Sequence, residues 1–153
     1  MSQRVTRNLK KYMDSSDVTS IRIGIREILI NAIEHGNLNI KFNEKTQALI
    51  DDTYFQFVQE RQKDPRYLDK QVTLEYSLNE QRVAYKIEDE GNGFDYQKIL
   101  DSIINQKDDE ALPHGRGLII TLDVFDSVKF NKKGNQVLLL KYFNNNSTES
   151  IQE

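Results

Sequence analysis

The segment Glu27-Ile-Leu-Ile-Asn31-Ala-Ile-Glu-His35-Gly36 decides the fold that we predict for this chain. Its apolar residues continue a repeat with helical spacing, which comprises Val18, Ile21, Ile25, Ile28, Leu29, Ala32 and Ile33. Intervals of three and four residues predict an amphipathic helix whose apolar side faces a core. Glu27 and Asn31 are four residues apart, so their side chains share one helical face. A carboxylate beside a carboxamide suits a water molecule and a hard cation, although a solvated polar face ended by Gly36 is the alternative.

Length and composition limit the class of protein. The 153 residues allow one compact domain with a proper core. Since 21 basic and 24 acidic residues are mixed along the chain, for a net charge of -3, we expect neither nucleic acid nor membrane as a partner. The absence of cysteine excludes disulfides, thiolate metal sites and cysteine nucleophiles. No apolar run approaches membrane-spanning length and the start has no hydrophobic signal region, so we expect a cytoplasmic protein.

Helices are predicted on both sides of the central segment. Residues 4–13 form a short amphipathic helix, and residues 14–17 break it and cap the long helix that follows. Residues 37–41 are expected to be a loop that enters a short extended piece. Apolar residues then recur at helical intervals from residue 43 to about residue 63, where Asp64-Pro65 ends the helix.

Two hairpins make up the predicted sheet. Residues 71–77 and 82–88 alternate apolar and polar side chains, and residues 127–131 and 137–143 flank the turn Lys132-Lys-Gly134-Asn135. Between the hairpins we expect a helix over 95–104, with Ile99, Leu100 and Ile103 facing inward. A polar loop over 105–116 should follow it. Residues 117–125 are expected to be a buried helix, and a strand is the alternative. This order predicts an α+β, two-layer domain with helices on one face of a largely antiparallel or mixed sheet.

Three polar features interrupt this apolar framework. They are Glu27 with Asn31, the turn Asp89-Glu-Gly91-Asn-Gly93-Phe94, and the segment His114-Gly-Arg-Gly117-Leu118. Glycines allow unusual backbone dihedrals and a close approach of N–H groups to a ligand. A helix that starts near Gly117 offers free N–H groups and the positive end of its dipole, and such a place suits phosphate.

The three features, in this order, resemble the motifs of the Bergerat or GHKL superfamily, which includes DNA gyrase, MutL and the ATP-binding domains of sensor histidine kinases. Glu27-x-x-x-Asn31-Ala-x-x-His35-Gly36 is similar to the N box, the turn from Asp89 to the first glycine box, and Gly115-x-Gly117-Leu118 to the second. The resemblance spans residues 17–142. Within the superfamily, Asn31-Ala-Ile-Glu-His35-Gly36 is most similar to the anti-sigma-factor serine/threonine-protein kinases.

The resemblance implies a role for each polar residue. Asn31 would hold Mg²⁺ through its side-chain oxygen, and Mg²⁺ would in turn hold the nucleotide phosphates. Glu27 would be the catalytic residue, a general base. Asp89 would accept a hydrogen bond from the adenine amine, which favours ATP over GTP. His35, at the end of the helix, would be structural.

The glycine motifs would contribute backbone contacts and a lid. Gly91, Gly93 and Phe94 would border the adenine and the ribose. Residues 95–116 would close over the triphosphate, with Gly115, Gly117 and Leu118 beside the phosphates. Arg116 would supply a cation there, and an exposed loop arginine is the alternative.

The chain also departs from the family pattern. Family members of the anti-sigma type usually begin with a strand and a helix before the N box, whereas residues 1–16 here are expected to be only an N-terminal helix and a connector. The domain over 17–143 therefore either lacks the first strand or was cut from a longer protein. Residues 43–70 are an insertion whose aromatics are expected in the core, with a docking surface as the alternative; they are Tyr54, Phe55, Phe57 and Tyr67. Gln136 replaces a threonine that is frequent in the family. The tail over 144–153 is expected to be flexible.

The resemblance leaves several functions open. The first is a Mg-ATP-dependent regulatory serine/threonine kinase that acts on an anti-sigma antagonist and holds a sigma factor or a similar protein partner. The second is a non-catalytic switch in which ATP changes affinity for a protein partner. The third is an ATPase or the ATP-binding catalytic domain of a two-component signalling protein. A homodimer is expected from the family alone.

Overall fold

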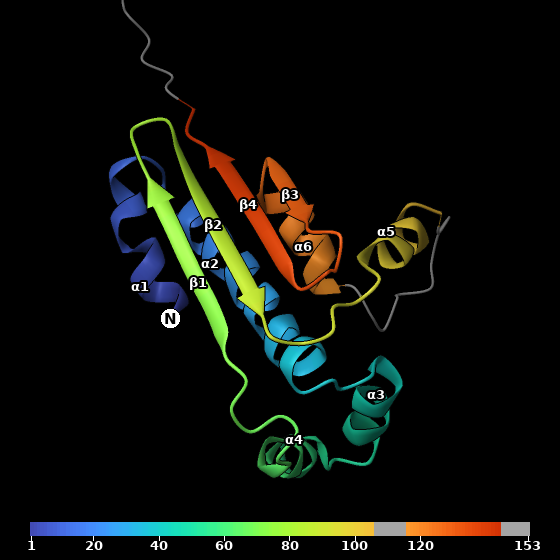
Figure 1. Ribbon diagram of the computed structural model, residues 1–153. Helices are drawn as coiled ribbons and strands as arrows, with labels where there is room; N and C mark the ends of the chain where they lie inside the picture. The colour runs from blue at the N-terminus through green and yellow to red at the C-terminus, as the bar shows by residue number, and fades with distance from the viewer. Residues whose placement is uncertain (106–115, 145–153) are drawn as a thin grey trace, which may run out of the picture.

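The computed structural model describes residues 1–105 and 116–144, with helices packed on one face of a four-stranded sheet (Figure 1). The strands are β1 (Val72–Leu78), β2 (Arg82–Asp89), β3 (Ser127–Phe130) and β4 (Gln136–Tyr142), in the order β1-β2-β4-β3. Every neighbouring pair is antiparallel. Both predicted hairpins are therefore confirmed, and so is the two-layer α+β fold.

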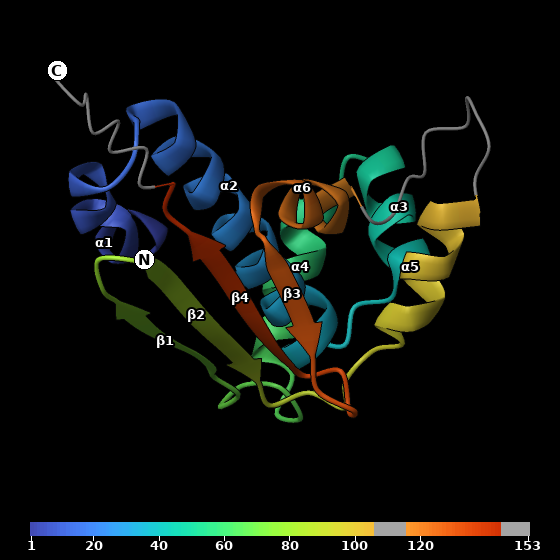
Figure 2. The same cartoon turned by 90° about the horizontal axis from the view of Figure 1, so that it is seen from above.

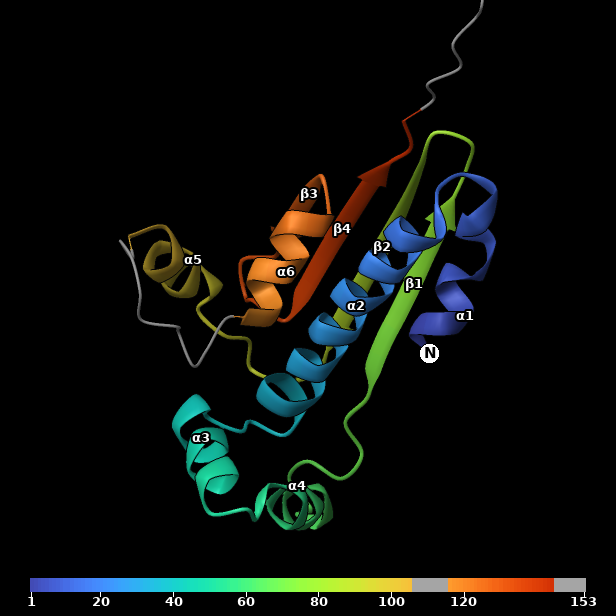
Figure 3. The same ribbon diagram turned by 180° about the vertical axis from the view of Figure 1, so that it is seen from behind.

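Two helices cover the sheet. Helix α2 (Ser15–Asn31) lies along β1 and β2, and α6 (Arg116–Val124) lies beside it over β4 and β3 (Figure 3). Figure 2 shows both helices on the same side of the sheet. The apolar stripe of the sequence explains this position, because Val18, Ile21, Ile25 and Ile28 are all buried. Asp14 stands at the N-terminal end of α2 as predicted, but its side chain makes no capping hydrogen bond.

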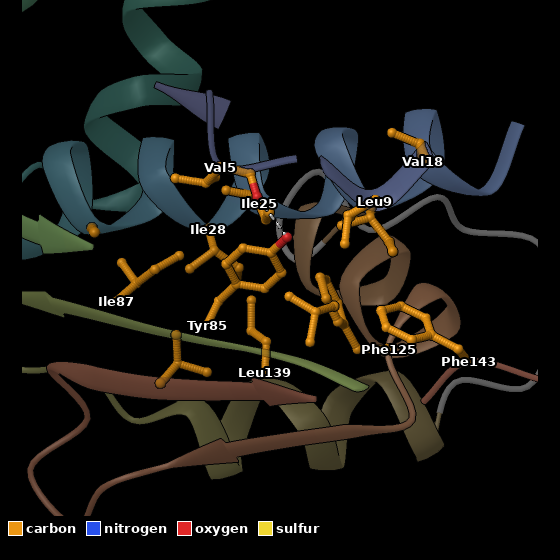
Figure 4. Close-up of a cluster of buried hydrophobic side chains, with 14 residues drawn as sticks. Val5, Leu9, Val18, Ile25, Ile28, Tyr85, Ile87, Phe125, Leu139 and Phe143 are labelled. Carbon is orange, nitrogen blue, oxygen red and sulfur yellow. Dashed lines mark hydrogen bonds between the residues drawn. The ribbon is translucent and has the colours of Figure 1, made fainter. Parts of the chain in front are cut away.

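The core lies between α2 and the inner side chains of β2 and β4 (Figure 4). Ile25, Tyr85 and Leu139 are fully buried there, and Tyr85 stands opposite Leu139 in the strand register. Burial of each such side chain contributes about 1.5–3 kcal/mol relative to exposure. The core thus fixes the position of α2, which carries Glu27 and Asn31, relative to the sheet.

The N-terminal segment belongs to this core. It forms two short helices, α1 (Ser2–Thr6) and the 3-10 helix η1 (Arg7–Lys11), where one helix over 4–13 was predicted. Val5 and Leu9 are buried, and the Tyr85 hydroxyl donates a hydrogen bond to the Val5 carbonyl at 3.1 Å. The segment therefore packs on the domain that follows it.

The end of the long helix changes its winding. Residues Ala32–Asn37 form a π-helical segment, η2, directly after α2. The backbone then folds back, because the Ile40 N–H donates to the Glu34 carbonyl at 2.8 Å and Asn39 has a φ of 49°. The loop therefore remains against the helix end. No strand forms near residue 40, although Lys41 has the extended backbone predicted there, with φ −76° and ψ 152°.

The predicted insertion forms two helices instead of one. They are α3 (Phe42–Ile50) and α4 (Tyr54–Lys63), and Asp52, with a φ of 55°, lies in the turn between them. We call residues 42–63 the insert. Ala48 is the buried residue of α3, α4 has none, and Phe55 is 73% exposed. The prediction that the aromatics of this region belong to the core is wrong, because the insert stands away from the sheet (Figure 3).

Helix α5 (Tyr96–Asn105) follows β2 and also lies outside the core. Ile99 and Leu100, which were predicted to face inward, are half-buried and do not belong to the core between α2 and the sheet. The predicted polar loop falls mainly on residues 106–115, and the predicted tail on residues 145–153; both lie outside the described residues, as does the side chain of Ile103. None of the helices in the described part of the chain is long and apolar enough to cross a membrane.

Candidate nucleotide-binding site

Glu27 and Asn31 lie in the C-terminal half of α2, next to the start of α6. A Cβ atom on Gly117 would lie 2.8 Å from Glu27 Oε2, so the glycine packs directly against this carboxylate. Both side chains are half-buried, and neither forms a hydrogen bond or an ion pair within residues 1–105 and 116–144. Their polar atoms also keep contact with solvent, because Tyr54 Oη is the one fully buried, unpaired side-chain atom found in that part of the chain. Two acceptors one helical turn apart are thus available to a ligand.

The first glycine turn is packed against the end of the same helix. A Cβ atom on Gly36 would overlap the Asp89 carboxylate, and one on Gly91 would overlap the Gly36 carbonyl. Only glycine allows so close an approach at both positions. Gly36 therefore brings Asp89 and Gly91 against the helix that carries Asn31. Asn31 lies four residues after Glu27, which contacts Gly117, and five residues before Gly36, which contacts Asp89.

Asp89 is a buried carboxylate, and one of its two oxygens forms a hydrogen bond within the protein. It is 4% exposed, and its Oδ1 accepts a hydrogen bond from the Gly91 N–H at 2.8 Å. Burial raises the pKa of Asp89 above its ordinary value, against the opposing effects of this hydrogen bond and of the nearby Lys133 ammonium group. Oδ2 accepts no hydrogen bond from the described residues and is not sealed from solvent. This oxygen can accept a hydrogen bond from a ligand amine.

Three asparagines that the sequence reasoning missed hold the site in place. Asn37 Oδ1 accepts the Glu90 N–H at 2.8 Å, and Asn135 Nδ2 donates to the Asp89 carbonyl at 2.9 Å. Asn131 Nδ2 in turn donates to Asn135 Oδ1 at 2.9 Å. The only sequence signal for the last two is the turn Asn131-Lys-Lys-Gly134-Asn135, which predicts a hairpin but not a contact with Asp89.

Gly93 and Gly134 pack two turns against each other. Their φ values are 81° and 82°, and a Cβ atom on either would overlap a backbone carbonyl of the opposite turn. Side chains with a Cβ rarely adopt this conformation. Phe94 then makes an edge contact with the Phe130 ring, with 5.7 Å between centroids, and Tyr96 stacks on that ring at 4.5 Å. The start of α5 is anchored to β3 in this way.

The structure describes only part of the second glycine motif, Gly115-x-Gly117-Leu118. Gly115 lies outside the described residues, whereas Arg116 and Gly117 form the first turn of α6. The Arg116 side chain is exposed. Leu118 is 3% exposed, so its side chain packs inside the protein and only its backbone N–H can reach a ligand. The first N–H groups of a helix have no partner within the helix and attract anions.

A cleft of about 830 Å³ adjoins these residues, a volume within the usual range for small-molecule sites. One wall is the segment from Gly93 to Ile99, and the other is formed by residues 39–43 and His35. Of the predicted site residues within 1–105 and 116–144, Gly93 and Phe94 line it, whereas Glu27, Asn31 and Asp89 do not. His35 directly precedes Gly36 and Gly93 closely follows Gly91, and both Gly36 and Gly91 pack against the Asp89 carboxylate, so the cleft begins next to Asp89 in the chain.

His35 supports this wall. Its Nδ1 lies 2.6 Å from the Ile40 carbonyl oxygen, and its ring lies 4.2 Å from that of Phe42, centroid to centroid. The imidazole thus ties the loop after η2 to the helix end. The contact supports the structural role predicted for His35.

The donor set fits a metal ion that is held jointly with phosphate. No group of three or more His, Cys, Asp or Glu side chains that could hold a metal occurs in residues 1–105 and 116–144. The accessible oxygens of Asn31 and Glu27 are hard ligands, which Mg²⁺ prefers, and Mg²⁺ usually binds through few protein ligands together with phosphate and water. The residues present therefore fit Mg²⁺ only in combination with a nucleotide.

Comparisons with known proteins identify the family. The family model described as the histidine kinase-like ATPase domain matches residues 2–141. No curated protein matches this chain. The match covers the helix with Glu27 and Asn31, the glycine turn at Asp89 and the start of α6, and it confirms the superfamily that the sequence motifs indicated. The chain therefore belongs to the histidine kinase-like ATPase domain family, whose members bind ATP.

Proposed function

We propose that this protein is a Mg-ATP-binding regulatory serine/threonine-protein kinase of the anti-sigma-factor type. One observation carries the proposal. The Glu27 carboxylate packs against Gly117, at the start of α6, and is not engaged by another described residue. A general base must be within reach of the proton that it accepts, and the N-terminal end of a helix attracts phosphate. Glu27 is thus close to the point where the terminal phosphate would bind.

The other side chains supply binding and orientation. Asn31, one turn beyond Glu27, would hold Mg²⁺, which when bound neutralises phosphate charge. Asp89 Oδ2 would accept a hydrogen bond from the adenine amine, and Gly93 and Phe94 would border the base and the ribose. Arg116 and the N–H groups of Gly117 and Leu118 would bind the phosphates. Phosphoryl transfer requires mainly positioning and charge neutralisation, which such a set provides.

Glu27 would take the proton from a serine or threonine hydroxyl of the protein substrate while the oxygen of that hydroxyl bonds to the γ-phosphorus atom of ATP. The bond from that phosphorus to the bridging oxygen breaks, and ADP leaves. We propose an anti-sigma antagonist as the substrate and a sigma factor or a similar protein as the partner that is held. The motif similarity at Asn31-Ala-Ile-Glu-His35-Gly36 is the support for these partners.

A second function is an ATP-dependent binding switch without catalysis. The position of α5 favours it, because Lys98 and Ile99 line the cleft while α5 lies outside the core cluster. A nucleotide in the cleft would contact this helix and could change its position, which changes the surface offered to a partner.

Glu27→Gln separates the two functions, because glutamine keeps the shape of glutamate but is not a base. With γ-labelled Mg-ATP and a purified anti-sigma antagonist domain, we expect the kinase to label a serine or threonine of the antagonist. Glu27→Gln should bind ATP normally and transfer phosphate about 10²–10⁴-fold more slowly. The matched control is Glu80→Gln, an exposed glutamate in the turn between β1 and β2, which should transfer at the wild-type rate. Normal ATP binding without labelling by the wild-type protein would support the switch instead.

A further inference from the structure

One wall of the cleft comes from a part of the chain that none of the three motifs includes. Asn39, Ile40, Lys41, Phe42 and Asn43 line it, opposite the glycine turn. These residues join η2 to the insert, and the last two begin α3. The shape of the cleft therefore depends on how this loop is held.

Arg61, on α4, holds the loop from 22 residues away. Its Nη1 donates hydrogen bonds to the carbonyl oxygens of Leu38, at 3.1 Å, and Asn39, at 3.2 Å. Its Nη2 donates to Glu44 Oε1 at 2.8 Å, and its guanidinium lies over the rings of Phe57 and Tyr67. The Arg61 side chain is only 18% exposed. An arginine is suited to such a position because its planar fork offers several donors in a fixed geometry.

The loop turns sharply beside the carbonyl groups that Arg61 binds. Asn39 has a φ of 49°, in the left-handed region, which asparagine adopts more readily than most other residues with a Cβ. The Arg61 hydrogen bonds to the carbonyl oxygens of Leu38 and Asn39 hold the backbone at this turn. Without them, the loop can relax and the wall would move relative to Gly93.

Glu44 links the same arginine to the next residue of the wall. Its Oε2 accepts the Lys41 N–H at 2.7 Å, and its Oε1 accepts Arg61. Partial burial would raise the pKa of Glu44, but the Lys41 hydrogen bond and the Arg61 charge outweigh it and hold this pKa below the ordinary value. Arg61 and Glu44 together therefore fix the backbone from residue 38 to residue 41.

We propose that the insert is part of the nucleotide site and that Arg61 is a positioning residue for it. The inference rests on the proposed ATP binding. Because the cleft begins next to Asp89 in the chain, the wall over 39–43 contacts the adenine and ribose end of the nucleotide. Arg61 touches no nucleotide atom itself; it holds the wall in the conformation that binds.

Arg61→Ala tests the proposal by titration calorimetry with ATP and with ADP. We expect the affinity for both nucleotides to fall by about tenfold and by the same factor, because the wall contacts the base and the ribose and not the γ-phosphate. The binding stoichiometry should stay at the wild-type value. A purely structural defect would lower the stoichiometry, since part of the protein would be unfolded, and leave the affinity of the folded part unchanged.

The control is Arg66→Ala. Arg66 also lies over the Tyr67 ring and pairs with an acidic residue, Asp64, but it makes no contact with the wall. Arg66→Ala should bind both nucleotides as the wild type does, and Arg61→Lys, which keeps the charge, should recover part of the affinity. If Arg61→Ala does not fold, Glu44→Gln decides the question, because it removes the ion pair with Arg61 and should weaken binding of both nucleotides to a smaller extent.

Two outcomes can be told apart. A wild-type protein that binds no ATP would contradict the proposed function. A wild-type protein that binds ATP while Arg61→Ala, or Glu44→Gln in its place, binds ATP and ADP with unchanged affinity would contradict only the role of the insert.

Discussion

The sheet with α2 and α6 and the insert with α3 and α4 are held together by different forces. Ile25 and Leu139 are fully buried between α2 and the sheet. The insert has one buried residue, Ala48. Its contacts with the rest include the ion pair of Lys45 with Glu34, the hydrogen bond of Arg61 to Leu38 and the ring contact of Phe42 with His35. Hydrophobic packing thus fixes the residues with the proposed chemistry, whereas charge fixes one wall of the cleft.

The difference implies that the two regions respond to different changes. Removal of a buried apolar side chain should lower the unfolding free energy of the sheet and α2 by nearly the same amount at every pH, because apolar packing involves no charge. Loss of a charge should loosen the insert and leave the sheet intact.

Ile25→Ala and Phe55→Ala should differ most in stability. Ile25 is fully buried in the core, and a large-to-small change there costs about 2–5 kcal/mol of unfolding free energy. Phe55 is 73% exposed on α4, and its loss should change the unfolding free energy by less than about 0.5 kcal/mol. Chemical denaturation measures both. Equal losses would show that the insert shares the packing of the core.

The same contrast explains what could be predicted from the sequence. Apolar periodicity identified α2 and both hairpins, because these elements bury one face against a common core. The single helix predicted over 43–63 was wrong, since the spacing continues from Ile50 to Tyr54 and Phe57 across the turn where Asp52 is left-handed. Asp has no obligatory turn conformation, so nothing in the residue types required a break there.

The sequence predicted which motifs meet in the candidate site, but it did not predict the residues that support them. The spacing of Glu27, Asn31 and the glycine motifs reflects where helix, turn and helix meet, and Gly117 does pack on Glu27. The π-helical segment η2 adds no distinctive residue type, yet it lies where Gly36 meets Asp89. The Arg61 contacts depend on the turn between α3 and α4, which the sequence reasoning missed.

Asp89→Asn should weaken ATP binding and stabilise the protein. Asparagine can still accept the Gly91 N–H, but it would present an NH₂ group where the adenine amine needs an acceptor. An unpaired polar group costs about 1–3 kcal/mol, so ATP affinity should fall by about 5–150-fold, and the preference for ATP over GTP should decrease. Calorimetric titration with both nucleotides measures this, and unchanged ATP affinity would exclude Asp89 from the adenine contact.

The stability gain follows from the raised pKa of Asp89. A carboxylate whose pKa is higher in the folded state favours folding while protonated, and this contribution is lost as the pH rises through the folded pKa. At neutral pH the buried charge therefore destabilises the wild type. Asp89→Asn should melt at a higher temperature at pH 7, and the difference should vanish as the pH falls below the unfolded value, near 3.8.

Glu44→Gln should show the opposite dependence on pH, with a smaller effect. The pKa of Glu44 is lowered in the folded protein, so its contribution is present above the unfolded value, 4.5, and is lost as the pH falls through the folded pKa. The variant should therefore exchange the amide hydrogens of residues 39–41 faster than the wild type at pH 7. The difference between the two proteins should disappear at more acid pH, with the β2 and β4 amides unaffected. A difference that persists below the folded pKa would mean that the Glu44 charge does not hold the wall.

The central claim is that Asn31, Asp89 and the start of α6 form one Mg-ATP site, and titration calorimetry of Asn31→Ala tests it most directly. Alanine suits a helix, so the variant should keep the fold and the wild-type melting temperature. We expect the wild type to bind ATP more tightly with Mg²⁺ than without it, and Asn31→Ala to lose this difference. Equal dependence on Mg²⁺ in both proteins would contradict the account.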